Sequence, residues 1–195
     1  MSKRRSLSHE ELTAELLENE LKRVRYRKKY RRTLANTILS LAAMALLVVV
    51  LVLILPVMTI TGDSMGDTLR QGELVAALRG AQVERGDIAA LQYGANKILI
   101  KRVIAGPGDE VTVQEDGKVL INGEELQEPY VTHAGGECDI EEMPYVVPEG
   151  RWFVMGDNRS LSLDSRNEQF GCVAQEQIIG PVVLRIWPLE QFGLL

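Results

Sequence analysis

The sequence predicts a mainly β protein, in which an extracytoplasmic antiparallel β-sheet domain is anchored by one N-terminal transmembrane helix. The first observation is an apolar run at residues 34–58 of the 195-residue chain. A helix needs about 20 such residues to cross the hydrocarbon core of a bilayer. The second observation is that short apolar segments with a period of about two, separated by Gly, Asp and Asn, follow Met58. This pattern is typical of many short strands.

The distribution of charge indicates the orientation of the chain. Residues 1–33 contain eleven Lys and Arg against five Glu, whereas residues 34–195 carry a net charge of −11. Basic residues beside a span remain in the cytoplasm, so residues 59–195 should lie outside the cell membrane. We expect a partly helical cytoplasmic segment 1–33, a transmembrane helix 34–58 and an extracytoplasmic β domain 59–195. A nucleic-acid-binding arm is a weaker interpretation, because the basic residues adjoin a membrane span, where the positive-inside rule already explains them.

A cleaved secretory signal is an alternative interpretation of the apolar run. Such signals have an apolar core of about 7–15 residues and an Ala-x-Ala cleavage site. The run at 34–58 is longer, and the sequence Leu55-Pro-Val-Met-Thr59 follows instead of such a site. We therefore expect an uncleaved anchor.

The β domain is predicted to contain seven strands. Glu115-Asp-Gly-Lys118 is a hairpin signal between two of them, and Asn122-Gly123 marks another turn. Residues 123–150 are acidic and rich in Gly and Pro, so we expect an irregular excursion there. The strands are expected at residues 73–78, 88–93, 97–104, 110–114, 118–121, 151–155 and 178–187.

Ser64 is a candidate nucleophile, because it follows the end of the apolar run closely and lies between two glycines in Gly62-Asp-Ser-Met-Gly66. A serine hydroxyl needs a base to take its proton. His133 is the histidine that follows the span, and a Ser-His-Asp triad through it stays open as an alternative. Nothing around His133 indicates a fixed orientation.

Lys101 is the more informative candidate base. It lies within Ile98-Leu-Ile-Lys-Arg-Val-Ile104, a strand that is apolar on both faces, with Leu99, Lys101 and Val103 on one side. Burial lowers the pKa of a lysine from about 10.4 toward neutrality, where the amine can act as a general base. The alternative is a strand lysine that extends its amine to water.

Metal and cofactor sites are not expected. The chain has two cysteines and two histidines, without CxxC or HExxH spacing. A disulfide between Cys138 and Cys172 stays open, because the exterior permits it but the sequence does not bring the two together.

Four blocks of the sequence, in order, resemble those of type I signal peptidases, the membrane-bound serine proteases with a Ser–Lys dyad. The last block fits the family pattern Gly-Asp-Asn-Arg-x-x-Ser-x-Asp-Ser-Arg at every fixed position, and the resemblance covers about residues 34–190. The blocks are Gly62-Asp-Ser-Met-Gly-Asp-Thr-Leu69, Arg85-Gly-Asp-Ile88, Lys101-Arg-Val-Ile-Ala-Gly-Pro-Gly-Asp109 and Gly156-Asp-Asn-Arg-Ser-Leu-Ser-Leu-Asp-Ser-Arg166.

The resemblance implies a role for each matching residue. Ser64 would be the nucleophile and Lys101 the general base. Ser162 would hydrogen-bond the lysine amine, and Asp164 and Arg166 would form a supporting ion pair. The implied reaction is cleavage of signal peptides from secretory preproteins after an Ala-x-Ala site. It would take place at the plasma membrane, near the secretion translocon, without a cofactor.

Two positions depart from the family pattern. Asp67 stands where the family has proline, and we expect it to point away from Lys101, since a nearby carboxylate would raise the lysine pKa. Gly62 stands where some members have a serine hydroxyl that donates to the oxyanion. The backbone N–H of Ser64 is therefore expected to be the main donor.

Two rival functions remain at this stage. A lapsed peptidase would be a membrane-tethered β domain that binds secretory chains without cutting them. A self-cleaving Ser–Lys protease of the repressor type is a second possibility. Proteases of that type carry a DNA-binding domain in place of a span, so the apolar run argues against it.

Overall fold

The computed structural model describes residues 9–94, 97–131 and 135–195, without the side chains of residues 9–15 and 20. His133 therefore lies outside the described residues. The chain divides into two compact units, residues 1–51 and 52–195.

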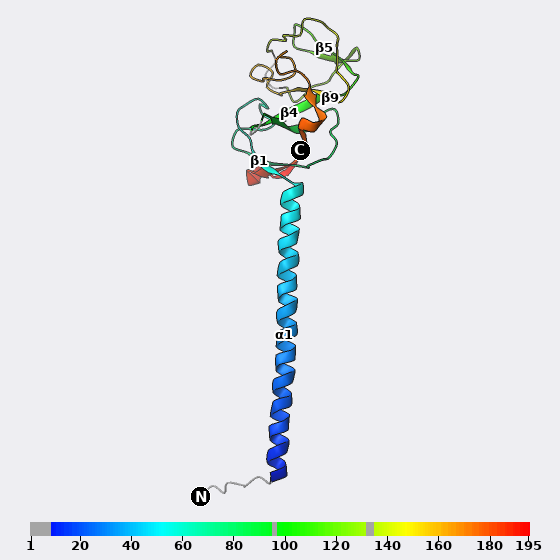
Figure 1. Ribbon diagram of the computed structural model, residues 1–195. Helices are drawn as coiled ribbons and strands as arrows, with labels where there is room; N and C mark the ends of the chain where they lie inside the picture. The colour runs from blue at the N-terminus through cyan, green and yellow to red at the C-terminus, as the bar shows by residue number, and fades with distance from the viewer. Residues whose placement is uncertain (1–8, 95–96, 132–134) are drawn as a thin grey trace. The chain divides into compact units, whose positions relative to one another are not determined.

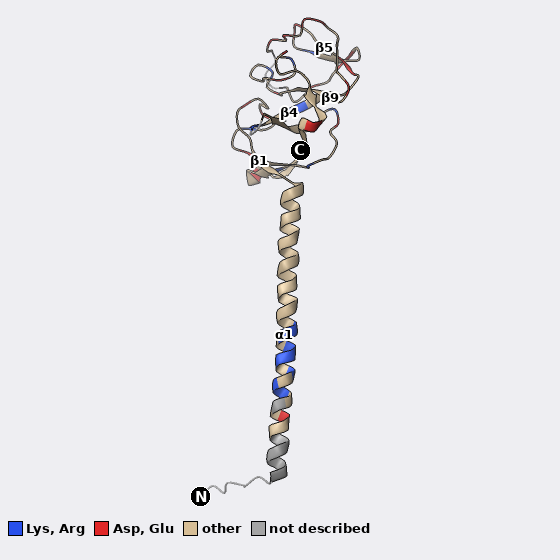
Figure 2. Ribbon diagram, in the orientation of Figure 1, with Lys and Arg blue, Asp and Glu red and all other residues tan. Residues whose placement is uncertain are grey.

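A single helix, α1 (His9–Ile54), contains both the basic segment and most of the apolar run (Figure 1). The lysines and arginines form a blue band on α1, and the part of this helix after Arg32 carries no charge (Figure 2). Residues 16–54 are long and apolar enough to be a candidate membrane span. The helix ends at Ile54 rather than at the predicted Met58, because Pro56 has no N–H with which to continue it.

The second unit consists of antiparallel strands in two sheets, which confirms the predicted mainly β fold. The larger sheet has the order β1-β2-β11-β3-β4-β9-β10, with β12 paired to β11, and the smaller has the order β7-β6-β5-β8. The strands are β1 (Val57–Thr59), β2 (Leu74–Ala77), β3 (Ile88–Tyr93), β4 (Lys97–Ala105), β5 (Glu110–Val113), β6 (Val119–Ile121), β7 (Glu124–Glu125), β8 (Tyr145–Val146), β9 (Arg151–Met155), β10 (Val173–Ala174), β11 (Ile178–Trp187) and β12 (Gly193–Leu194). Two short 3-10 turns, η1 (Gln175–Gln177) and η2 (Leu189–Gln191), flank β11.

All seven expected strands are present, because alternation of apolar and polar residues records which face of a strand is buried. The expected excursion at 123–150 is only partly irregular. It supplies the two-residue strands β7 and β8, which pair with β6 and β5 to complete the smaller sheet.

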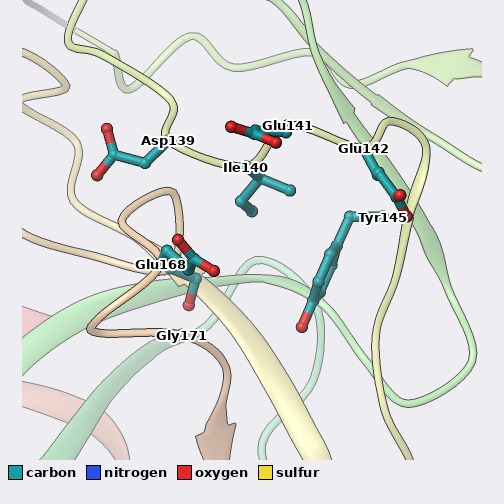
Figure 3. A pocket seen from close by; sticks show the side chains of 8 residues that line it. Asp139, Ile140, Glu141, Glu142, Tyr145, Glu168 and Gly171 are labelled. Carbon is teal, nitrogen blue, oxygen red and sulfur yellow. The ribbon is translucent and has the colours of Figure 1, made fainter.

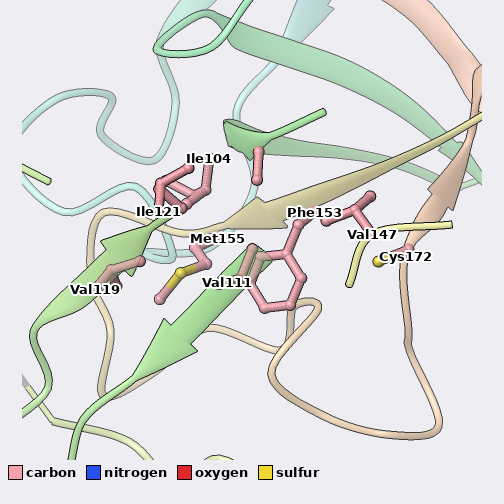
Figure 4. Packing of buried hydrophobic residues seen from close by; sticks show 9 residues of the cluster. Ile104, Val111, Val119, Ile121, Val147, Phe153, Met155 and Cys172 are labelled. Carbon is pink, nitrogen blue, oxygen red and sulfur yellow. The ribbon is translucent and has the colours of Figure 1, made fainter. Parts of the chain in front are cut away.

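The hydrophobic core consists of three clusters of buried side chains. In the first, Val111, Val119 and Phe153 pack around Met155 and Cys172 (Figure 4). Cys172 and Cys138 are both free thiols, so the disulfide left open by the sequence is not formed. The second cluster holds the Ser64 turn, and the third includes side chains of the neighbouring strands β3, β4, β9 and β10.

Candidate active site

The turn that carries Ser64 is an excursion between β1 and β2 with a closed base. The Ile60 N–H donates to the Glu73 carbonyl at 2.9 Å, and the Gly72 N–H donates to the Ile60 carbonyl at 3.0 Å. Met65 and Leu69 are 1% and 0% exposed and pack into the second core cluster. These two buried side chains fix the turn, and Ser64, directly before Met65, is half-buried.

The segment at 156–158 holds the turn from the other side. The Asn158 N–H donates to the Ser64 carbonyl at 3.0 Å. A Cβ built at Gly156 would overlap both the Ser64 carbonyl oxygen and the Ser162 hydroxyl. Only glycine permits this close approach. The backbone of Ser64 and the side chain of Ser162 are therefore neighbours across Gly156.

Lys101 is buried in β4, with 3% of the residue exposed, and its amine donates to the Ser162 Oγ at 2.9 Å. Burial lowers the pKa of Lys101 to about 8, although the Asp164 carboxylate opposes the shift. Asp67 does not take part, because its carboxylate pairs with Arg70 at 3.0 Å on the surface. The expectation that Asp67 points away from the lysine is confirmed.

Asp164 and Arg166 form the buried ion pair beside this lysine. The Arg166 Nε and Nη2 lie 2.9 and 3.0 Å from the two carboxylate oxygens. Asp164 also accepts a hydrogen bond from the Gly156 N–H at 3.0 Å, and Arg166 donates to the Arg159 carbonyl at 2.7 Å. The pair thereby fixes the turn that presents Ser162 to Lys101.

Comparisons with known proteins identify the family of the chain. The family model for signal peptidase, peptidase S26, matches residues 31–187. The chain belongs to the signal peptidase family. The enzyme class expected from the sequence is confirmed: the protein is a hydrolase of the signal peptidase class.

Two curated relatives show how much of the chain is shared within the family. Signal peptidase IB of Staphylococcus aureus strain Mu50 is 34% identical over 153 residues, which are 69% of this chain and 78% of the relative. Signal peptidase I of Bacillus amyloliquefaciens is 33% identical over 145 residues, 67% of this chain and 73% of the relative. A solved signal peptidase I from Enterococcus faecalis V583 is 32% identical, with a TM-score of 0.44, and the match covers 52% of this chain and 97% of that one.

Several buried charges around the site were not predicted from the sequence. Arg102, next to Lys101, donates to Asp157 at 2.9 and 2.6 Å and to the Gly86 carbonyl at 2.7 Å. Arg159 donates to Glu128 at 2.9 and 2.5 Å. Asp157 and Arg159 lie within the fourth block, so the sequence offered both as candidates for buried charges. Glu128 lies in the acidic excursion, and no local sequence pattern distinguishes it from the other acidic residues there.

A narrow cleft passes between the Ser64 turn and the first half of β4. Its volume is about 50 Å³. The β4 residues before Arg102 pair only with β3 within the described ranges, since the pairing of β9 with β4 begins at Arg102. The backbone edge of β4 beside the cleft is therefore unpaired. The cleft is lined by Met58, Thr59, Ile60, Thr61, Gly62, Ser64, Met65, Ile98, Leu99 and Ile100.

A second hollow, of about 460 Å³, lies apart from this cleft and is acidic (Figure 3). Its lining includes Asp139, Glu141, Glu142 and Glu168 around Tyr145. No group of three or more His, Cys, Asp or Glu among the described residues could hold a metal ion.

The structure thus brings most of the candidate residues together. Lys101 donates to the half-buried Ser162, and Asp164 and Arg166 form a buried ion pair beside the lysine. The Ser64 carbonyl accepts a hydrogen bond from Asn158 of the same block as Ser162. Gly62 lies in the same turn with φ +86, a conformation that glycine adopts without strain.

Proposed function

We propose that the protein is a membrane-bound serine endopeptidase that cleaves signal peptides from secretory preproteins, with Ser64 as the nucleophile and Lys101 as the general base. The burial of Lys101 is the observation that carries this proposal. A lysine with a pKa of about 8 is partly neutral at physiological pH, and its hydrogen bond to Ser162 directs it toward the Ser64 turn. An arginine at this position would stay protonated and could not act as a base.

The proposed reaction is acyl transfer. Neutral Lys101 takes the Ser64 proton as Oγ attacks the scissile carbonyl, and the protonated amine then gives that proton to the departing amine of the mature chain. Lys101 next takes a proton from the water that attacks the acyl-enzyme, and Ser64 is regenerated. The Ser64 N–H donates no hydrogen bond to the described part of the chain, so it is free to stabilise the oxyanion.

The cleft supports binding of the preprotein as an added strand. The unpaired edge of β4 offers backbone donors and acceptors to an extended chain. The cleft beside Ser64 is narrow, so it should accept small side chains more readily than branched ones. We infer that small residues, as in Ala-x-Ala, occupy the −1 and −3 positions.

Substitution of valine or leucine for the −1 alanine of a synthetic signal peptide is expected to reduce kcat/KM by at least about 10-fold, because the larger side chain would overfill the cleft. The same substitution at −2 serves as the control and should have little effect. Equal tolerance of leucine at −1 and −2 would contradict the proposed binding mode.

The proposed location is the plasma membrane, with α1 as the single span, the N-terminus in the cytoplasm and residues 59–195 outside as the catalytic domain. Ser64 is the tenth residue after the end of α1 at Ile54, which limits their separation to about 35 Å. Ser64 would then lie close to the membrane lipid and to the translocon from which preproteins emerge.

This orientation is tested by adding a protease outside intact cells. We expect digestion of residues 59–195 and protection of an epitope at the N-terminus. In inverted membrane vesicles, the N-terminal epitope should be digested and residues 59–195 should be protected. An N-terminal epitope that is digested in intact cells would overturn the orientation.

A further inference from the structure

Arg185 in β11 is a half-buried arginine that belongs to none of the four family blocks. Its side chain is 14% exposed, and its Nε lies 3.1 Å from the Glu73 carboxylate. Its Nη2 donates to the Thr68 carbonyl at 2.5 Å, and its Nη1 donates to the Gln191 side chain at 2.6 Å. One guanidinium thus connects the end of the Ser64 turn with the C-terminal segment at η2.

Stability alone is a weak reason to keep this charge inside the protein. The desolvation of a buried ion pair offsets much of its attraction, and well-packed apolar residues often stabilise a fold equally well. The guanidinium has one property that an apolar residue lacks, since its rigid fork holds several acceptors in a defined geometry. One of these acceptors is the backbone of the turn that carries Ser64.

Thr68 is held on its other side as well. Its hydroxyl donates to the Asp157 carboxylate at 2.6 Å. Asp157 accepts two hydrogen bonds from Arg102, the residue that follows Lys101 in β4. Thr68 therefore lies at a junction, with its carbonyl fixed to β11 and its hydroxyl fixed, through Asp157, to the strand that carries the lysine.

We propose that Thr68 and Arg185 are positioning residues of the cleavage reaction, which hold the Ser64 turn at the correct separation from Lys101. The inference rests on the proposed Ser64–Lys101 chemistry. Thr68 lies four residues after Ser64 in the same turn, and neither Thr68 nor Arg185 lines the cleft. They act through the turn, because a displacement of the nucleophile by about 1 Å can reduce the rate by about 100-fold.

The first test compares Thr68→Val with Thr68→Ser in the full-length protein in detergent micelles, with a synthetic signal peptide as substrate. Valine keeps the shape of threonine but removes the hydroxyl that binds Asp157. We expect kcat to fall by about 10- to 100-fold, with KM within about twofold and the pH midpoint of kcat unchanged. Thr68→Ser keeps the hydroxyl and should restore most of kcat.

The second test addresses Arg185. Arg185→Lys keeps the charge beside Glu73 but cannot bind Thr68, Gln191 and Glu73 through one planar fork. It should lower kcat without a matching change in KM. In the double variant with Thr68→Val, the two losses should be less than additive, because both act on the same turn.

Two substitutions elsewhere in the β domain serve as matched controls. Thr112→Val alters a half-buried threonine of β5 in the smaller sheet. Arg151→Lys alters another arginine that donates to a backbone carbonyl, that of Cys172, at 3.0 Å. Both controls should retain wild-type kcat. Thermal unfolding of every variant is measured, so that kcat is compared only at temperatures where the protein is folded.

Three results would overturn the positioning role: wild-type kcat in Thr68→Val, a Thr68→Ser variant as slow as Thr68→Val, or a loss of kcat that follows the fraction of unfolded protein. These outcomes differ from a failure of the proposed function. Cleavage that persists in Ser64→Ala or Lys101→Ala would refute the dyad. Inactive dyad variants beside an unimpaired Thr68→Val would refute only the positioning role.

Discussion

Replacement of Ser64 by alanine is expected to abolish cleavage of a signal peptide while the protein still folds and inserts into the membrane. The substitution removes one hydroxyl, whereas the turn is held by the Ser64 carbonyl and by the buried side chains of Met65 and Leu69. Without the nucleophile the acyl-enzyme cannot form, and the rate should fall by at least about 10³-fold. The thermal midpoint should change little, since no buried partner is left unpaired.

The measurement is cleavage by purified full-length protein under single-turnover conditions, followed by mass spectrometry of the products. Ser160→Ala is a suitable control, because this serine lies in the fourth block but donates to Asn158 rather than accepting from the lysine. It should remain active. Cleavage at the normal site by Ser64→Ala, at more than about a hundredth of the wild-type rate, would exclude Ser64 as the nucleophile.

Replacement of Lys101 by methionine or arginine is expected to be equally damaging, since neither residue can accept the serine proton at neutral pH. For the wild type, kcat should rise with pH and reach half of its maximum near pH 8, because the active form of Lys101 is the neutral amine. At pH 7 about a tenth of the molecules would hold a neutral lysine, compared with fewer than about one in a thousand at the ordinary lysine pKa.

Lys101 is needed for activity, but its buried amine should lower the stability of the fold at neutral pH. The pKa of Lys101 is lower in the folded state than in the unfolded state, because burial removes water from the charged amine. Below about pH 8 the amine is charged in both states, so this desolvation lowers the free energy of unfolding. Stability should increase as pH rises from about 8 toward the ordinary lysine pKa. Lys101→Met should therefore be inactive yet more stable at pH 7, by roughly 1–3 kcal/mol.

Denaturant unfolding at pH 7 and pH 10, together with the pH dependence of kcat, checks both expectations. The gain in stability of Lys101→Met over the wild type should shrink at pH 10, where the lysine is neutral in the folded state. A wild-type kcat that is flat between pH 6 and pH 9 when chemistry limits the rate would argue against a lysine base. Cleavage by Lys101→Arg would argue against it directly.

The strands and the apolar part of α1 were predictable because they depend on local patterns. A strand with one buried face shows a period of two, and an apolar run shows its length, without reference to the rest of the chain. The end of the helix was less accurate, because the sequence Leu55-Pro-Val-Met58 is apolar but Val57 and Met58 belong to β1. Hydrophobicity alone does not distinguish the last turn of a span from the first strand of a domain.

The supporting contacts were less accessible than the candidate residues. Lys101 and Ser162 could be named from the four blocks, but the close approach at Gly156 and the pairing of Arg159 with Glu128 join segments distant in the chain. Whether Cys138 and Cys172 form a disulfide also depends on the tertiary structure, which has both as free thiols.

By itself, the sequence determined the apolar anchor segment, the mainly β architecture and the chemical groups available for catalysis, because composition and periodicity are properties of neighbouring residues. Only the tertiary structure decided how these groups are poised. The pKa of Lys101 depends on burial by surrounding strands and on Asp164, and the Ser64 turn is held by Asn158 and Arg185. Desolvation and hydrogen bonding between distant segments arise only when the chain folds, so no local pattern records them.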